Sequence, residues 1–197
     1  MEIAYLPSLT PQAGLPTATS LVAKREVVYT RFFHRPYRSI SLREFCVGSD
    51  MPVINNWAWK MSHAAKIVAA SYLYTGASDF ARSFMVLVNN HPLCQIDICI
   101  ADKDELFESY HSAPGDFIMR FLLNPDKKKI RSLHAKALQV CIEYFFSFAE
   151  VKRLVAAPDT GNQLNNELLY KAGFRYREKV YSQYGVSNLY VCTRGQV

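Results

Sequence analysis

The segment Pro114-Gly-Asp-Phe-Ile-Met-Arg-Phe-Leu-Leu-Asn-Pro125 predicts the centre of the fold. Its residues Asp116–Leu123 are strongly apolar, which is typical of a central strand covered on both faces. The charge then changes abruptly at Asp126-Lys-Lys-Lys-Ile-Arg131. An apolar stripe with helical spacing follows from Ile130 to Phe148, and it predicts a long helix with one buried face.

Two strands joined by a tight connection are expected before this segment. Phe84–Val88 and Leu93–Ile100 are apolar runs, and Asn89-Asn-His-Pro92 between them has the residue types of a turn. The second run alternates, so its side chains point in turn to the two faces of the sheet. One face takes Cys94, Ile96, Ile98 and Ile100, and the other takes Gln95, Asp97 and Cys99.

The residues further upstream predict one more strand and two helices. Arg38–Phe45 alternates polar and apolar residues, which is typical of a half-buried strand. Ser49 and Asp50 offer an N-cap for an aromatic helix that continues to about Ala65. A second helix is expected over Ala69–Phe80, where Gly76 interrupts it.

The C-terminal part predicts a strand, a helix and a closing hairpin. Arg153–Ala157 is a short strand, and Asp159 or Thr160 caps a helix over Gln163–Ala172 that ends at Gly173. The hairpin strands are Phe174–Gln183 and Ser187–Thr193. The elements predict one α/β domain over residues 37–197, with a twisted mixed sheet of seven strands flanked by about four helices. The proline-rich start predicts an irregular N-terminal arm over residues 1–36.

Composition and charge narrow the class of protein. Half of the 197 residues are apolar and 20% are charged, which excludes a largely disordered chain, and no run is long and apolar enough to span a membrane. The start lacks the features of a secretory signal, and five cysteines without a C-x-x-C pair favour a reducing cytosol.

The net charge of +6 favours an anionic partner. The positively charged residues of the chain are scattered, except for the cluster at Lys127–Arg131. Nucleic-acid binding would need a broad basic surface, so this distribution favours a phosphate-bearing cofactor over nucleic acid.

The element order resembles that of the acyl-CoA-dependent N-acyltransferases of the GNAT fold. Asn89–Cys99, Asp104–Tyr110 and Pro114–Pro125 resemble the siderophore-biosynthesis branch, in which a Pro-x-Gly-x-x-Glu strand, an acidic turn ending in tyrosine and a Gly-Asp-x-x-x-His strand follow in this order. Arg153–Asn162 is similar to that family's Arg-x-x-x-Glu-Pro-Asp-x-Arg-Asn, and Tyr170–Phe174 to its Glu-Lys-x-Gly-Phe. The resemblance covers about residues 38–193.

The resemblance implies transfer of an acetyl or longer acyl group from coenzyme A to an amine or N-hydroxylamine. It implies a catalytic aspartate and histidine; Asp159 matches the aspartate, and Arg120 stands at the histidine position. An arginine stays protonated and cannot act as a neutral base. The sequence also departs from the family at Cys94, which replaces a glycine, and at Ala157, which replaces the glutamate of Glu-Pro-Asp.

The cofactor-binding residues are predicted around the start of the long helix. A helix N-terminus binds phosphates, and four cations lie there, although a solvated basic turn is the alternative. The phosphate loop of the family, Gln/Arg-x-x-Gly-x-Gly/Ala, reads Arg131-Ser-Leu-His-Ala-Lys136, so both glycines are missing and weakened binding of coenzyme A is expected. The predicted cofactor contacts are Phe121, Leu122, Leu123, Lys128, Lys129, Arg131, Ser132, Leu133, His134 and Asn162.

Several residues are candidates for catalysis or for binding the acceptor. Asp159 is a general base or an anchor for the ammonium of the substrate, or an N-cap of the following helix. Asp97 either pairs with Arg120 on the adjoining strand or faces the substrate. His111 is a second candidate base. The predicted acceptor contacts are Asp97, Gln95, Trp57 and Asp116. The histidines are too widely spaced for a metal site.

The sequence therefore predicts a cytoplasmic, monomeric or homodimeric N-acyltransferase that uses acetyl-CoA or another acyl-CoA and no metal. Its expected partner is a small-molecule amine or hydroxylamine, not nucleic acid or a membrane. The alternative is a non-catalytic GNAT-like binding protein with a degenerate site for coenzyme A. Arg120 and the altered phosphate loop favour that alternative.

Overall fold

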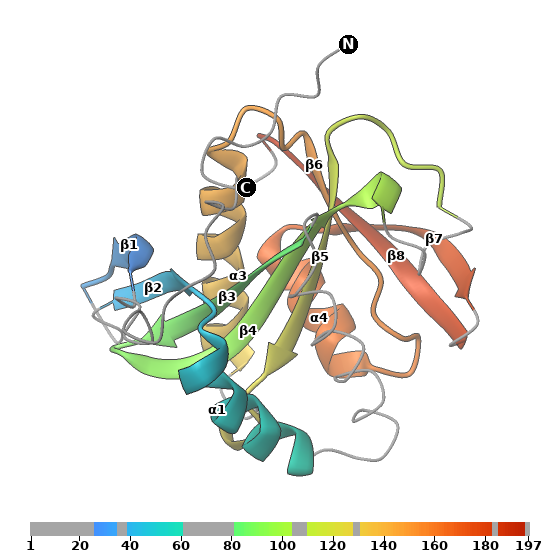
Figure 1. Ribbon diagram of the computed structural model, residues 1–197. Helices are drawn as coiled ribbons and strands as arrows, with labels where there is room; N and C mark the ends of the chain where they lie inside the picture. The colour runs from blue at the N-terminus through green and yellow to red at the C-terminus, as the bar shows by residue number, and fades with distance from the viewer. Residues whose placement is uncertain are drawn as a thin grey trace.

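Eight strands form one mixed sheet in the computed structural model, which describes residues 26–34, 39–60, 81–103, 110–127, 131–182 and 185–195. The strands are β1 (Val27–Phe32), β2 (Ser39–Glu44), β3 (Ala81–Val88), β4 (His91–Ile100), β5 (Asp116–Leu123), β6 (Arg153–Ala156), β7 (Arg175–Ser182) and β8 (Gly185–Thr193). The helices are α1 (Val47–Trp59), α3 (Arg131–Phe146) and α4 (Gln163–Ala172). The order across the sheet is β1-β2-β3-β4-β5-β6-β8-β7, as Figure 1 shows.

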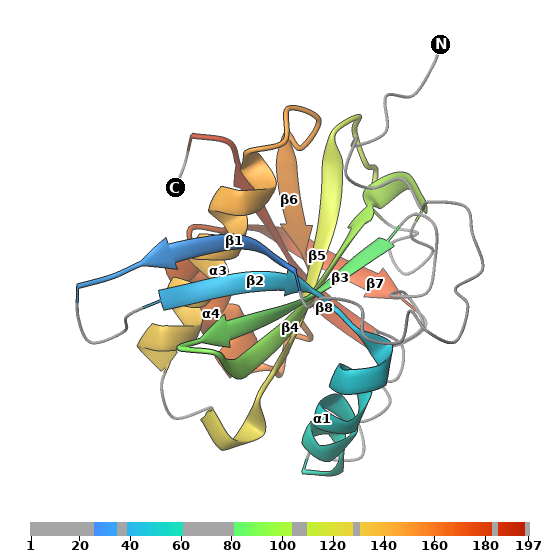
Figure 2. The same ribbon diagram turned by 60° about the vertical axis from the view of Figure 1, so that its left-hand side comes forward.

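The α/β class predicted from the sequence is confirmed, with one more strand than expected. Val27–Phe32 is strand β1, which pairs with β2 at the edge of the sheet (Figure 2). The irregular arm predicted over residues 1–36 is therefore wrong for these residues. The described residues hold three α-helices, and the further helix predicted over Ala69–Phe80 lies outside them.

Helix α1 begins earlier and ends earlier than the sequence indicated. Its N-cap is Cys46, which makes no capping bond through its side chain, rather than Ser49 or Asp50. Its last residue is Trp59 instead of about Ala65. The helix is tied to the sheet by an ion pair instead of a side-chain cap: Asp50 lies in its first turn and binds Arg43 of β2.

The two faces of the sheet pack against different helices. Alternate residues of β3 show this, because Phe84 and Val86 join the large apolar core under α3 and α4, whereas Met85 and Leu87 pack against Ile54 and Trp57 of α1. Asp97 and Arg120 stand opposite each other in the register of β4 and β5, on the face that α1 covers in part. The sequence pattern of β4 thus assigned its two faces correctly.

The sheet divides between β5 and β6, the two parallel neighbours. Strand β5 pairs with β4 from Phe117 to Leu123, but it pairs with β6 only at Asp116, Phe117 and Ile118. Beyond that point the two parts of the sheet diverge (Figure 1). In the part of the chain that the structure describes, the β6-facing edge of β5 from Met119 to Leu123 has no strand beside it. We call this segment the open edge of β5.

Gly115, the residue just before β5, lies in close contact with the turn that leads into β6. Gly115 has a φ of +91°, and a Cβ atom there would lie 2.5 Å from Cγ of Lys152 and 3.0 Å from the carbonyl oxygen of Glu150. The carbonyl of Gly115 accepts hydrogen bonds from the backbone N–H groups of Lys152 and Arg153. Glycine at this position therefore lets the two strands start side by side.

We expect Gly115→Ala to lower the free energy of unfolding by about 1–3 kcal/mol, because alanine is strained at a positive φ and meets the backbone of the neighbouring turn. Gly48→Ala in α1 is the matched control, since no atom lies within 4 Å of its added Cβ. We expect that change to leave stability unchanged or to raise it by up to about 1 kcal/mol. Urea unfolding of both variants measures the difference, and equal effects would contradict this account of Gly115.

All five cysteines are free thiols, and all but Cys46 are buried. Burial raises the pKa of Cys94 to about 12, and this residue packs in the large core. None of the helices within the described ranges is long and apolar enough to cross a membrane.

Candidate active site

Asp97 is a buried carboxylate in the middle of the sheet. It lies opposite Ser83 of β3 and Arg120 of β5, and its side chain is among the least exposed polar groups, at 4%. Its Oδ1 atom accepts hydrogen bonds from Ser83 Oγ and from Gln95 Nε2, the latter at 3.0 Å. Asp97 and Gln95, both predicted as acceptor contacts, are therefore brought together by the strand.

Burial raises the pKa of Asp97 to about 6, because a carboxylate is poorly solvated there. The hydrogen bonds from Ser83 and Gln95 and the charge of Arg120 act in the opposite direction and only partly offset this effect. The group is thus ionised at neutral pH and is a stronger base than an ordinary aspartate. This is the property that a general base at neutral pH needs.

Arg120 is also buried, with 7% of its surface exposed, and it lies on the open edge of β5. Its Nη1 atom approaches Cys99 Sγ at 3.8 Å. Of the four influences on the pKa of Asp97, the charge of Arg120 is the smallest. The strand register places Arg120 opposite Asp97, and the charge of the guanidinium favours the ionised form of the carboxylate.

Asp116 forms a second polar cluster, at the start of β5. Its carboxylate accepts bonds from Arg153 Nε at 2.5 Å, Arg153 Nη2 at 2.7 Å, Tyr110 Oη at 2.7 Å and the backbone N–H of Ala113 at 2.8 Å. Burial acts to raise its pKa, but the bonds from Arg153, Ala113 and Tyr110 together hold that pKa below the usual value. These four bonds use the acceptor capacity of a carboxylate. Asp116 thus anchors the paired ends of β5 and β6, and these contacts do not support its predicted role in binding the acceptor.

Asp159 follows β6 on an exposed turn. Its Oδ1 atom accepts a hydrogen bond from the backbone N–H of Gly161 at 2.7 Å. The N-cap of α4 is Asn162, whose side chain accepts from the N–H of Asn165 at 3.2 Å, so the predicted caps Asp159 and Thr160 are wrong. Because β5 and β6 are parallel, Asp159 lies at the end of β6 where the two strands have separated.

The start of α3 is described in part. Ser132 is exposed, whereas Leu133 and His134 are buried, so only the backbone of these two residues can meet a phosphate. Lys128 and Lys129 lie outside the described residues, as does the side chain of Arg131. The Phe121, Leu122 and Leu123 side chains are buried, and their backbone forms the open edge of β5.

The remaining predicted residues lie in different surroundings. Trp57 is buried in the apolar cluster with Met85 and Leu122, whereas Trp59 is 78% exposed. Trp57 is therefore a core residue, and its predicted contact with the acceptor is not supported by this position. His111 is exposed, on the chain between Tyr110 and Asp116. No group of three or more metal-ligating side chains occurs among the residues with described positions.

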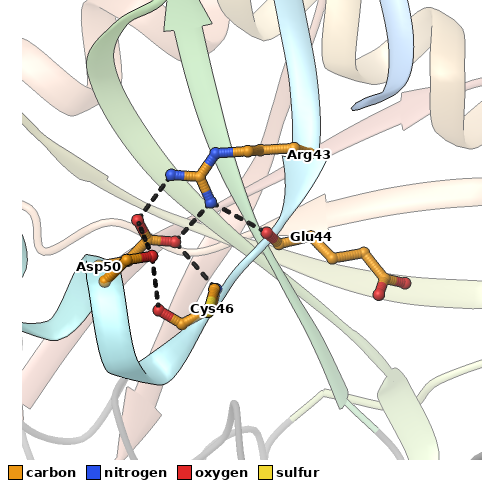
Figure 3. A network of polar contacts seen from close by, with 5 residues as sticks. Arg43, Glu44, Cys46 and Asp50 are labelled. Carbon is orange, nitrogen blue, oxygen red and sulfur yellow. Dashed lines mark hydrogen bonds and ion pairs between the residues drawn. The ribbon is translucent and has the colours of Figure 1, made fainter. Parts of the chain in front are cut away.

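Sequence reasoning missed a buried ion pair between β2 and α1 (Figure 3). Both guanidinium terminal nitrogens of Arg43 bind the carboxylate of Asp50 at 2.6 Å, and the backbone N–H of Cys46 donates to the same carboxylate at 2.9 Å. The two side chains are 5% and 2% exposed. The pair joins β2 to the first turn of α1. Ser83 was missed as well, because its role depends on the register of β3 and β4.

A mixed sheet that divides between two parallel strands, with helices on both faces, is the α/β architecture of the GNAT fold. The family model for the acetyltransferase (GNAT) domain matches residues 49–181. Because this match covers more than half of the chain, the protein belongs to the acetyltransferase (GNAT) domain family. No curated protein matches the sequence.

Solved structures of low sequence identity share this fold. An uncharacterized protein (bh2621) from Bacillus halodurans has a TM-score of 0.72 and 16% identity, over 85% of this chain and 91% of that chain. The aminoglycoside acetyltransferase AAC(6′)-Ib in complex with coenzyme A and kanamycin has a TM-score of 0.67 and 19% identity, over 79% and 95%. A spermidine N-acetyltransferase SpeG chimera from Vibrio cholerae and hSSAT has a TM-score of 0.54 and 13% identity, over 78% and 95%.

Proposed function

We propose that this protein is an acyl-CoA-dependent N-acetyltransferase acting on a small-molecule amine or N-hydroxylamine. The observation that carries the proposal is the open edge of β5, which lies on the strand next to the buried carboxylate of Asp97. Family membership supports acetyl transfer. Similar structures that are named as acting on aminoglycosides and spermidine support an amine acceptor.

The open edge fits the extended arm of an acyl-CoA. Alternate residues of Met119–Leu123 direct backbone N–H and C=O groups away from β4, and an extended amide chain can pair with such an edge as a further strand would. The same N–H groups can polarise the carbonyl of a thioester held there. The N-terminus of α3, with Lys128, Lys129, Arg131 and Ser132, would hold the phosphates. Because His134 and Lys136 stand where the family has glycines that let the backbone approach the phosphates, we expect weaker binding than in the family.

The chemistry of the proposed reaction is direct attack of the acceptor nitrogen on the thioester. In this reaction the C–N bond forms, the C–S bond breaks, and one proton leaves the nitrogen while one joins the sulfur. Asp159, by its match to the family motif, is a candidate to accept that proton or to anchor an ammonium, with Asn162 beside it. His111 stays a second candidate. The side chain of Arg120 supplies positive charge and no basic nitrogen.

The proposal for the particular acceptor rests on the local sequence resemblance. We propose a siderophore-biosynthesis type of substrate, such as a hydroxylated lysine, ornithine or diamine, and a monomeric or homodimeric enzyme in the cytoplasm. The matching segments are Asn89–Cys99 and Pro114–Pro125. They contain Asp97 and Arg120, the two charged groups that face each other in the sheet.

We expect the purified protein to bind acetyl-CoA and to release free thiol from it when an amine acceptor is added. Titration calorimetry measures the binding, and a thiol-specific dye measures the release. No heat at millimolar acetyl-CoA would end the proposal. Heat without thiol release for every acceptor would instead favour the alternative, a non-catalytic GNAT-like binding protein. The observation that favours this alternative is Arg120, which stands where the family motif has its catalytic histidine.

A further inference from the structure

Gln95 carries a buried acceptor that no group of the described chain satisfies. The residue is 2% exposed, and its Nε2 atom donates to Asp97 Oδ1. This bond fixes the orientation of the amide, because an ionised carboxylate can only accept. The Oε1 atom then points elsewhere, is buried, and accepts no hydrogen bond from the residues that the structure describes. A buried acceptor without a donor is costly, so its presence indicates a donor that arrives with a ligand.

Asp97 offers a second acceptor next to the first. Ser83 and Gln95 both donate to Oδ1, so among the described residues Oδ2 receives no donor. Gln95 and Asp97 are two positions apart on β4 and therefore lie on the same face. Two neighbouring acceptors, one of them charged, match a nitrogen that carries at least two hydrogens, or one N–H and one O–H.

The position of this pair fits the reaction better than that of Asp159. Asp97 faces Arg120, which is two residues beyond Ile118, where pairing of β5 with β6 stops. A thioester held along the open edge would thus lie one strand away from the carboxylate. Asp159 instead lies exposed to solvent on a turn after β6.

We propose that Asp97 and Gln95 form the acceptor site, in which Asp97 takes the proton from the attacking nitrogen and Gln95 Oε1 accepts a second hydrogen of the same group. The acceptor class is a primary amine or an N-hydroxylamine, and a tertiary amine is excluded. This inference rests on the proposed function. The proton that Asp97 takes passes to the departing sulfur, so that one amide and one thiol form with no net change in protons.

The groups around Asp97 suit this role. Ser83 faces it from β3, Gln95 and Cys99 lie beside it on β4, and Arg120 faces it from β5. Arg120 is the charged member of this set, and its charge favours the ionised carboxylate. Turnover should therefore rise with pH on a limb near pH 6, because the pKa of Asp97 is about 6 and only the ionised group can accept a proton.

The test compares the wild type with Asp97→Asn, Asp97→Glu, Gln95→Met and Asp159→Asn. Asp102→Asn, on an exposed residue just after β4, is the matched control and should leave kcat unchanged. The acceptors are L-lysine, L-ornithine, cadaverine and their N-hydroxylated forms. We expect Asp97→Asn to lower kcat by about 10²–10⁴-fold, to abolish the limb near pH 6, and to leave the calorimetric Kd for acetyl-CoA unchanged. Asp97→Glu should restore part of the activity.

Gln95→Met should raise the KM for the acceptor about tenfold or more, with a smaller effect on kcat. Retention of kcat and of the pH limb in Asp97→Asn, or their loss in Asp159→Asn alone, would overturn the inference.

If the wild type shows no turnover at all, the proposed function fails separately. The acceptor site is then tested by calorimetric binding of the same amines, which should weaken about tenfold or more in Asp97→Asn and Gln95→Met. Equal binding by wild type and variants, or no binding to the wild type, would overturn it.

Discussion

Replacement of Arg43 by methionine is expected to lower the free energy of unfolding by about 3–5 kcal/mol. Asp50, whose side chain is 2% exposed, would keep its charge in the interior but lose both bonds from the guanidinium (Figure 3). The remaining donors, including the backbone N–H of Cys46, do not replace a positive charge. Unfolding in urea, followed by circular dichroism, measures the loss.

A matched control comes from the neighbouring strand. Arg82 of β3 binds Glu44 in an ion pair that is much more open to solvent, with side chains 27% and 53% exposed. We expect Arg82→Met to change the free energy of unfolding by no more than about 1 kcal/mol. The double variant Arg43→Met/Asp50→Leu should recover most of the loss, because no buried charge is left without a partner. Equal losses for Arg43→Met and Arg82→Met would contradict the importance given to burial.

Asp97→Asn is expected to act in the opposite direction and to stabilise the protein at pH 8 by roughly 3 kcal/mol. The pKa of Asp97 is raised to about 6 from the usual 3.8, chiefly by burial, so the folded protein holds this proton more tightly than the unfolded chain. The contribution of Asp97 to stability is therefore present below pH 4. It is lost as the pH rises from about 4 to about 6, and it stays lost above that range.

Urea unfolding of wild type and variant at pH 4 and at pH 8 checks this prediction. The gain from Asp97→Asn should be large at pH 8 and small at pH 4, where the folded protein holds Asp97 in its neutral form. A variant that is less stable than the wild type at pH 8 would show that the carboxylate is well solvated or well paired. A more stable variant with low turnover would mean that the ionised Asp97 carboxylate lowers the free energy of unfolding but is needed for the reaction.

The elements with strong local signals were predicted closely. Strand β5 and helix α4 have the predicted bounds, because a continuous apolar run and a glycine C-cap mark them, the latter at Gly173 with a φ of 112°. Strand β1 was not predicted, because it lies at the edge of the sheet and its residues do not alternate between buried and exposed positions. The start of α1 was missed because Cys46 makes no side-chain cap.

The candidate site was predicted less completely, because its properties depend on contacts between strands. The alternation of β4 placed Gln95 and Asp97 on one face, and the strand register confirms that Arg120 lies opposite Asp97. The sequence could not show that Asp97 is more deeply buried than Asp159, nor that Asp116 is fully used by Arg153, Tyr110 and Ala113. The Arg43–Asp50 pair has no sequence pattern of its own.

The most direct test of the proposed activity is the identity of the product. The protein is incubated with isotopically labelled acetyl-CoA and each amine or N-hydroxylamine acceptor, and the mixtures are analysed by mass spectrometry. We expect the label in an amide or hydroxamate of at least one acceptor, with an equal amount of free coenzyme A and little product from Asp97→Asn. Intact labelled acetyl-CoA bound to the protein, with no labelled product from any acceptor, would contradict N-acetyl transfer and identify a binding protein instead.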